Sequence, residues 1–161
     1  MHATHTGTAA RMRRAARGFT LPELLVVVTV LGVLLAAGVP QFGEFIRSQR
    51  VKTASFDLFS SLMLARSEAI TRNAKVTVAP TGGVWTNGWT VTEPGGTVIR
   101  RQEGVPNVSI SGPAAVVYGE SGRLSAASSP AFELTAAGSH VVNRCIRIDL
   151  GGRPVSKATS C

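Results

Sequence analysis

The chain has 161 residues and a mass of 16.8 kDa, which corresponds to one modest domain with appendages rather than two domains. Apolar residues make up 44% of it and charged residues 16%, and this balance excludes a disordered chain. The formal net charge is +8, but four arginines and no acid lie in residues 1–18. The remaining chain has 13 basic and 9 acidic residues, a net charge of +4, so its charge alone does not indicate nucleic-acid binding.

Residues 1–40 combine a basic segment with an apolar one. Residues 1–18 are polar, basic and without apolar periodicity, whereas residues 19–40 carry a single charge, at Glu23. At about 1.5 Å per residue, a helix over the apolar residues would be roughly 30 Å long, the thickness of a hydrocarbon core. We therefore predict a transmembrane helix over residues 19–40. The arginines before it predict that its N-terminal end stays in the cytoplasm and that its other end leaves the membrane on the opposite side.

A secretory signal peptide is an alternative interpretation of the same residues. Its cleavage site would lie at the small residues 36–38, and the product would be a secreted soluble protein. The apolar stretch is longer than the usual ~7–15 residues, however, and Glu23 lies in its first turn, where an acid gives a signal peptide no advantage. Because a carboxylate inside a membrane costs roughly 3 kcal/mol, it indicates a function. A cut between Gly18 and Phe19 would free an α-amino group able to pair with Glu23 of a neighbouring subunit.

Gly18, Phe19 and Glu23 lie at fixed offsets between the basic leader and the apolar helix. This arrangement resembles the class III signal of type IV prepilins and type II secretion pseudopilins. In that family, prepilin peptidase cuts after the glycine and methylates the phenylalanine amine, and the glutamate aids the docking of subunits. The resemblance implies that the leader, residues 1–18, is removed, that Phe19 is N-methylated and that Glu23 serves assembly.

The same resemblance implies partners and a location. The partners would be prepilin peptidase, the inner membrane and, through the N-terminal helix, other major and minor pilins. The chain would cross the bacterial inner membrane once, with its C-terminal domain in the periplasm. It would then enter a pilus or pseudopilus filament.

A second helical pattern follows the apolar segment over residues 41–73. Pro40 is expected to kink the helix without ending it. After Pro40, apolar residues recur at the i, i+3, i+4, i+7 spacing of an amphipathic helix, and Asn73 is a candidate C-cap. The stripe consists of Val51, Ala54, Leu58, Leu62, Ala65 and Ala69. The sequence thus predicts one helix from about Leu21 to Arg72, whose second half packs on a globular domain.

Residues 74–161 change to short apolar alternations between turn residues. Candidate strands lie at residues 76–78, 84–86, 89–91, 97–100, 108–110, 115–118, 132–134 and 145–148. Asn87 and Gly88 provide a two-residue hairpin signal between the second and third of these. We predict an antiparallel β-domain of roughly six to eight strands, with boundaries uncertain by a few residues. The fold class is α+β, a long N-terminal transmembrane and amphipathic helix packed on a small antiparallel β-domain, as in pilins.

Few residues of this β-domain indicate a chemical activity. Trp85 and Trp89 are interpreted as core or hairpin aromatics rather than as a stacking platform for bases or sugars, because no basic residues interleave them. Outside the leader, His140 is the one histidine, so the sequence indicates neither a metal cluster nor a catalytic triad. It also has no phosphate-binding loop. We expect no enzymatic activity, no cofactor and no metal.

Cys145 and Cys161 are the two cysteines of the chain. In an exported domain they are expected to form a disulfide that closes a loop of about 15 residues and stabilises the fold by roughly 3 kcal/mol. The bridge would hold the end of the chain on a strand. Two reasons for it stay open: stabilisation of a small domain, or a function of the tail's surface.

Four basic residues and one acid lie in residues 141–161, and the basic ones are Arg144, Arg147, Arg153 and Lys157. Residues 64–70 (LARSEAI) resemble the helix end of minor pseudopilins of the FimT and GspH type. Gly152 and Arg153 resemble the start of the Gly-Arg-rich C-terminal loop by which FimT-type minor pilins contact DNA during natural transformation; the second arginine of that loop falls at Val155. The resemblance implies a minor pilin of a type IV pilus-like filament whose four basic residues contact double-stranded DNA without sequence specificity. The alternatives are a solvated basic edge and a GspH-type pseudopilin of type II secretion without DNA binding.

Overall fold

The computed structural model describes residues 19–161, except for the side chains of residues 37–41. The chain divides into two compact units, one up to Gly38 and one from Val39 to Cys161. Helix α1 (Leu21–Arg72) has 52 residues and contributes to both units. The predicted helix bounds, Leu21 and Arg72, are confirmed.

The N-terminal end of α1 is capped by its own residues. The carbonyl oxygen of Thr20 accepts a hydrogen bond from the backbone N–H of Leu24 (3.1 Å). The backbone N–H of Thr20 donates to Oε2 of Glu23 (3.5 Å), as in the reciprocal half of a capping box. Pro22 lies in the first turn, where the helix needs no backbone donor. Glu23 therefore has a local partner in the isolated chain.

The first half of α1 is apolar around its whole circumference. Its large apolar side chains from Leu21 to Leu35 are 53% to 79% exposed. Among the described residues, no helix has both the length and the apolar character needed to cross a bilayer. The transmembrane helix expected over residues 19–40 includes residues 37–40, whose side chains lie outside the described part, and it stays a prediction. The kink expected at Pro40 falls on the same residues and stays a prediction as well.

The second half of α1 supplies the central part of the core of the second unit. The whole predicted stripe is fully buried: Val51, Ala54, Leu58, Leu62, Ala65 and Ala69. The helix ends in a Schellman motif, because Asn73 adopts a left-handed φ of 51° and the N–H of Ala74 donates to the carbonyl of Ala69 (3.2 Å). The predicted C-cap at Asn73 is confirmed.

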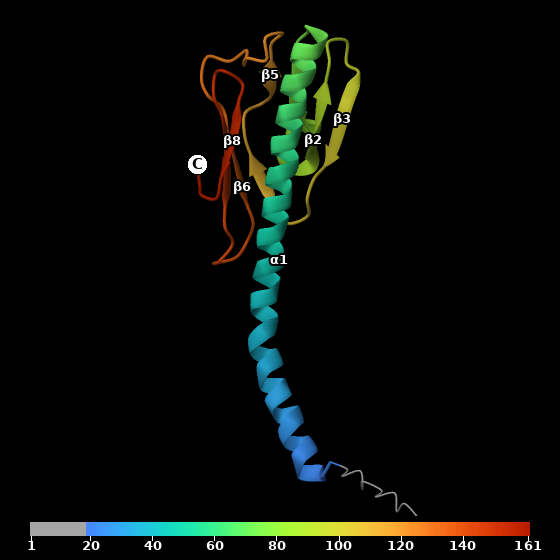
Figure 1. Cartoon of the computed structure of the whole chain (residues 1–161), viewed down its shortest axis with the longest axis vertical. Helices are drawn as coiled ribbons and strands as arrows, with labels where there is room; N and C mark the ends of the chain where they lie inside the picture. Colours follow the sequence, from blue (N-terminus) through green and yellow to red (C-terminus); the bar gives the residue numbers. More distant parts are fainter. Residues whose placement is uncertain (1–18) are drawn as a thin grey trace, which may run out of the picture. The chain divides into compact units, whose positions relative to one another are not determined.

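In residues 19–161, eight strands form two antiparallel sheets, each with four strands. Figure 1 shows several of these strands on the two sides of α1. The first sheet has the order β3-β2-β1-β5 and contains β1 (Val76–Pro80), β2 (Gly88–Thr92), β3 (Val98–Glu103) and β5 (Val116–Tyr118). The second has the order β4-β6-β7-β8 and contains β4 (Ser109–Ser111), β6 (Ala131–Thr135), β7 (Arg144–Ile148) and β8 (Pro154–Lys157). Buried residues of both sheets join the helix stripe in one hydrophobic core.

The hairpin predicted around Asn87 and Gly88 is wrong. The expected strand at residues 84–86 is replaced by two short 3-10 turns, η1 (Thr81–Gly83) and η2 (Trp85–Asn87). The cause is the burial of Trp85, whose indole N–H donates to the carbonyl of Pro113 (2.7 Å) and whose ring packs edge-on against Phe132 at 4.8 Å. β2 therefore pairs with β1, across the connection formed by residues 81–87, and with β3.

The other predicted strands are confirmed within three residues of their expected bounds, but β8 was not predicted. Its residues were interpreted as part of a basic loop, and they form the edge strand of the second sheet, paired with β7. Trp85 and Trp89 are buried in the core, as expected.

Replacement of Leu58 tests the central place of the helix stripe. Leu58→Ala is expected to lower the free energy of unfolding by about 2–5 kcal/mol, because it leaves a cavity between the helix and the sheets. Met63→Ala is the matched control on the same helix, since Met63 is 41% exposed, and it should cost about 1 kcal/mol or less. Denaturant unfolding of both variants measures the difference; equal losses would contradict the account of the core.

Candidate functional site

A tight turn places Arg153 at the start of β8. The backbone N–H groups of Asp149 and Gly152 donate to the carbonyls of Arg153 (3.1 Å) and Asp149 (2.8 Å), and a side-chain oxygen of Asp149 accepts from the N–H of Arg153 (2.9 Å). Gly152 has a φ of 83°, and a Cβ there would collide with the carbonyl oxygen of Gly122. Gly152 is therefore required by the turn itself, whatever Arg153 contacts.

The disulfide between Cys145 and Cys161 holds the C-terminal residues against β7. The two Cα atoms lie 5.0 Å apart, which confirms the expected bridge. Arg147 adds a second tie, because its Nη2 donates to the carbonyl oxygen of Cys161 (2.8 Å). Part of the positive charge predicted to meet DNA is thus already engaged with the chain's own backbone.

The four basic residues do not form a single patch. Arg147 and Lys157 line a shallow hollow together with the two bridged cysteines. Arg144 and Arg153 line a different space, the groove between α1 and β8. The positive charge at this edge of the second sheet is therefore divided between two hollows, which meet at Val155.

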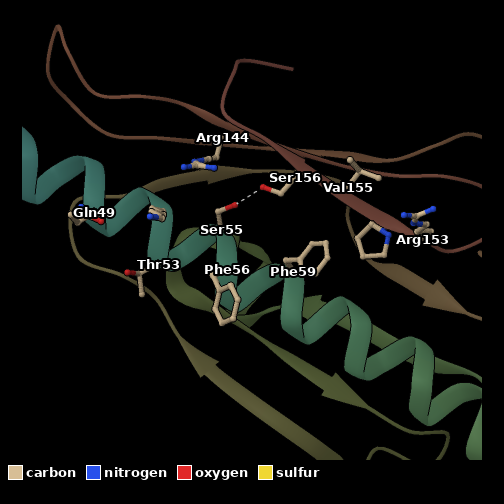
Figure 2. Close-up of a pocket in the computed structure, with 11 residues that line it drawn as sticks. Gln49, Thr53, Ser55, Phe56, Phe59, Arg144, Arg153, Val155 and Ser156 are labelled. Carbon is tan, nitrogen blue, oxygen red and sulfur yellow. Dashed lines mark hydrogen bonds between the residues drawn. The ribbon is translucent and has the colours of Figure 1, made fainter.

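The groove between α1 and β8 is the largest of the hollows described for the domain, at about 660 Å³ (Figure 2). Ser55 of the helix and Ser156 of β8 share a hydrogen bond between their hydroxyl oxygens (3.1 Å), which joins the two walls. Phe59 packs partly into the core, whereas Phe56 is 70% exposed. The lining residues are Gln49, Lys52, Thr53, Ser55, Phe56, Phe59, Arg144, Arg153, Pro154, Val155 and Ser156.

The sequence did not point to this groove as a site. Phe56 and Phe59 lie one helical turn apart and off the buried stripe, which was the available signal for a second apolar face. Ser156 gave no signal, because its place depends on the pairing of β8 with β7.

The N-terminal residues with predicted roles lie at or beyond the start of the described chain. Gly18 lies outside the described residues. Phe19 is 78% exposed, and Glu23 is exposed at the first turn of α1. His140 lies in an exposed turn. Within residues 19–161, no group of three or more potential metal ligands is found.

Tyr118 lies beside the turn that precedes β8. Its phenol is fully buried, and its hydroxyl has no hydrogen-bond partner among the described residues. Burial raises the pKa of Tyr118 well above its ordinary value of 10.0; the charge of Asp149 raises it further, and Arg66 opposes the shift.

The fold is that of a pilin with a two-sheet C-terminal domain, as solved structures show. The minor pilin FimU of Pseudomonas aeruginosa superposes with a TM-score of 0.61 at 19% identity, over 70% of this chain and 92% of that one. The minor pseudopilin EpsH from the type 2 secretion system of Vibrio cholerae superposes with a TM-score of 0.56 at 13% identity, over 68% of this chain and 97% of that one.

The sequence comparisons identify the family. Residues 54–152 match the family described as type II transport protein GspH, and residues 13–39 match the prokaryotic N-terminal methylation motif. Because the first match covers more than half of the sequence, the chain belongs to the GspH family.

Two curated relatives from Pseudomonas aeruginosa, each named a fimbrial protein, are 32% identical over 68 residues. That segment is 42% of this chain and 44% of each relative, so the chain spans less than half the length of the curated relatives it matches.

The burial of Tyr118 predicts a pH dependence of stability. The folded chain holds this phenol neutral above the pH at which the unfolded chain ionises it. The contribution of Tyr118 to stability should therefore be constant below about pH 10 and fall as the pH rises further. Tyr118 is the one tyrosine of the chain, so its absorbance reports this ionisation directly. In the folded chain, the rise in absorbance that marks ionisation of Tyr118 should come well above pH 10 or coincide with unfolding. A rise at pH 10 without unfolding would contradict the burial of Tyr118.

Proposed function

We propose that the chain is made as a prepilin, cut after Gly18 by prepilin peptidase, methylated on Phe19 and built into a type IV pilus-like filament as a minor subunit. The observation that carries the proposal is the N-terminal methylation motif over residues 13–39, followed by a helix whose apolar side chains are exposed. A helix that is apolar on all sides is stable only in lipid or among other apolar helices. Before assembly this helix holds the chain in the inner membrane with the β-domain in the periplasm.

Glu23 has the position and the chemistry for docking in this proposal. In the isolated chain it is exposed, and its one hydrogen bond, to the backbone N–H of Thr20, is at the long end of the hydrogen-bonding range (3.5 Å). Cleavage after Gly18 creates a cationic amine on Phe19. In a stack of helices, Glu23 of one subunit can pair with the Phe19 amine of the next, and the apolar surroundings strengthen that attraction.

Two substitutions of Glu23 separate docking from helix capping. Glu23→Ala removes both the charge and the cap, whereas Glu23→Gln keeps a side chain that can cap the helix and removes the charge alone. We expect both variants to be processed normally and to be lost from filaments by about tenfold or more, with Glu120→Ala as an exposed control that leaves both steps unchanged. Immunoblots of membrane and filament fractions measure both steps. Normal incorporation of Glu23→Gln would contradict the ion pair.

DNA binding is a second candidate function, and the exposure of Arg153 and Lys157 favours it. Double-stranded DNA contacted through a few phosphates would bind weakly, without sequence specificity and with strong dependence on salt. Because the four basic residues line two hollows that meet at Val155, a duplex would have to cover both hollows to meet all four. A GspH-type pseudopilin of type II secretion would show no such binding.

The two hollows can be tested separately for DNA binding. If DNA covers both, the pair Arg144→Ala, Arg153→Ala and the pair Arg147→Ala, Lys157→Ala should each weaken binding and each reduce the slope of log K against log salt by about 2. Fluorescence anisotropy of a labelled duplex with residues 19–161 in a non-ionic detergent measures both quantities. An absence of binding at low salt would leave the secretion-type pseudopilin as the function.

A further inference from the structure

The free edge of β8 offers backbone groups for one more strand. β8 pairs with β7 on one side, and no strand of the described chain pairs with its other side. In an antiparallel pair, successive residues point their backbone N–H and C=O groups alternately toward the partner strand and away from it. The N–H of Asp149 donates to the carbonyl of Arg153, so Arg153 and every second residue after it point toward the partner strand. Val155 and Lys157 therefore direct their N–H and C=O groups toward β7. Ser156 directs both of its groups to the free edge, and Pro154 directs its carbonyl there.

The groove beside this edge has an apolar wall. Lys52, Ser55, Phe56 and Phe59 lie at i, i+3, i+4 and i+7 on one face of α1 and line the groove opposite β8. An aromatic ring exposed to 70%, as Phe56 is, offers a contact for an apolar side chain of whatever occupies the groove. The hydrogen bond between Ser55 and Ser156 keeps the helix and the strand close, so the space suits a single extended chain and is too narrow for a nucleic-acid duplex.

The charge of the groove is of one sign. Lys52, Arg144 and Arg153 line it, and no aspartate or glutamate does. Among the described residues, both ion pairs involve Arg72, so none of these three cations is neutralised within the chain. The groove therefore complements a negatively charged occupant.

The positions of the two arginines set the spacing of that negative charge. In Figure 2, Arg144 and Arg153 lie toward opposite ends of the groove, with Ser156 between them. Arg153 lies opposite Asp149, the residue after the end of β7. Asp149 follows Arg144 by five residues, so the backbones of Arg144 and Arg153 are separated along the strand direction by about 17 Å, at about 3.4 Å per extended residue. An extended segment of six or so residues spans this distance.

We propose that the groove binds an extended acidic segment of a neighbouring filament subunit, which adds to the edge of β8 as a further strand. Its backbone pairs with Ser156 and with the carbonyl of Pro154. Its carboxylates meet Arg144 and Arg153, and an apolar side chain between them contacts Phe56 and Phe59. This inference rests on the proposed filament role in one respect, namely that the acidic segment comes from a neighbouring subunit of the filament. Binding by the groove is a separate property, measurable without a filament.

The test uses residues 19–161, the whole described chain, in a non-ionic detergent. The probe is a fluorescent peptide of about eight residues in which valine alternates with glutamate, and peptides that alternate valine with serine or with lysine are its controls. We expect the glutamate peptide alone to bind. Arg153→Glu should weaken its binding by about tenfold or more. Lys157→Glu makes the same change of charge at a residue that lines the hollow at the disulfide and not the groove, and it should weaken binding by about twofold or less.

A matched pair of substitutions at Ser156 tests the strand addition. Ser156→Pro removes the free-edge N–H and should weaken peptide binding by about tenfold, whereas Ser156→Ala loses the same hydroxyl, keeps the N–H and should change binding by about threefold or less. Circular dichroism confirms that each variant is folded. Equal effects of the two Ser156 variants would overturn the strand addition. Equal effects of Arg153→Glu and Lys157→Glu, with displacement of the peptide by a DNA duplex, would overturn the peptide site in favour of a general anion-binding surface.

Failure of this test and failure of the proposed function are distinguishable. A chain that enters filaments but does not bind the glutamate peptide overturns the groove proposal alone. A chain that binds the peptide with the expected variant pattern but never enters filaments overturns the filament role and leaves the groove as a peptide-binding site.

Discussion

The burial of one stripe of α1 under both sheets is the constraint on which the domain depends. The stripe runs from Val51 to Ala69 and is fully buried, and the core that it forms includes residues of each sheet. Two four-stranded sheets that share no strand pairing need a common support, and the helix provides it. With that face committed to the core, Phe56 and the groove side chains of α1 are left for contacts outside the chain.

The helix and most strands could be predicted because their signals are local. The bounds of α1, its buried stripe, its C-cap at Asn73 and seven of the eight strands follow from periodicity, capping chemistry and turn residues. The local structure at Trp85 could not be predicted from the sequence. Its hydrogen bond to Pro113 and its contact with Phe132 are tertiary interactions, and they outweigh the hairpin preference of Asn87 and Gly88. β8 was missed for a related reason: its residues lack apolar alternation, and its partner β7 defines it as a strand.

The sequence could predict which residues belong to the candidate site, but not how they are arranged in space. The sequence singled out the disulfide and the basic residues around it, and the bridge is present. It could not show that Arg144 and Arg153 line the groove beside α1 whereas Arg147 and Lys157 line the hollow at the disulfide, because those places depend on the pairing of β8 with β7. That separation changes the function that the basic residues support. A single patch favours a polyanion, whereas two arginines at the ends of a narrow groove favour a single extended chain.

The filament role is the central claim, and the mass of the chain in its assembled form tests it most directly. Filaments sheared from the producing cells and analysed by intact mass spectrometry should contain the chain from Phe19 to Cys161, one methyl group heavier than its sequence and with its disulfide intact. A chain that begins after Gly38, found in the medium and absent from filaments, would instead identify a cleaved secretory signal and contradict the account.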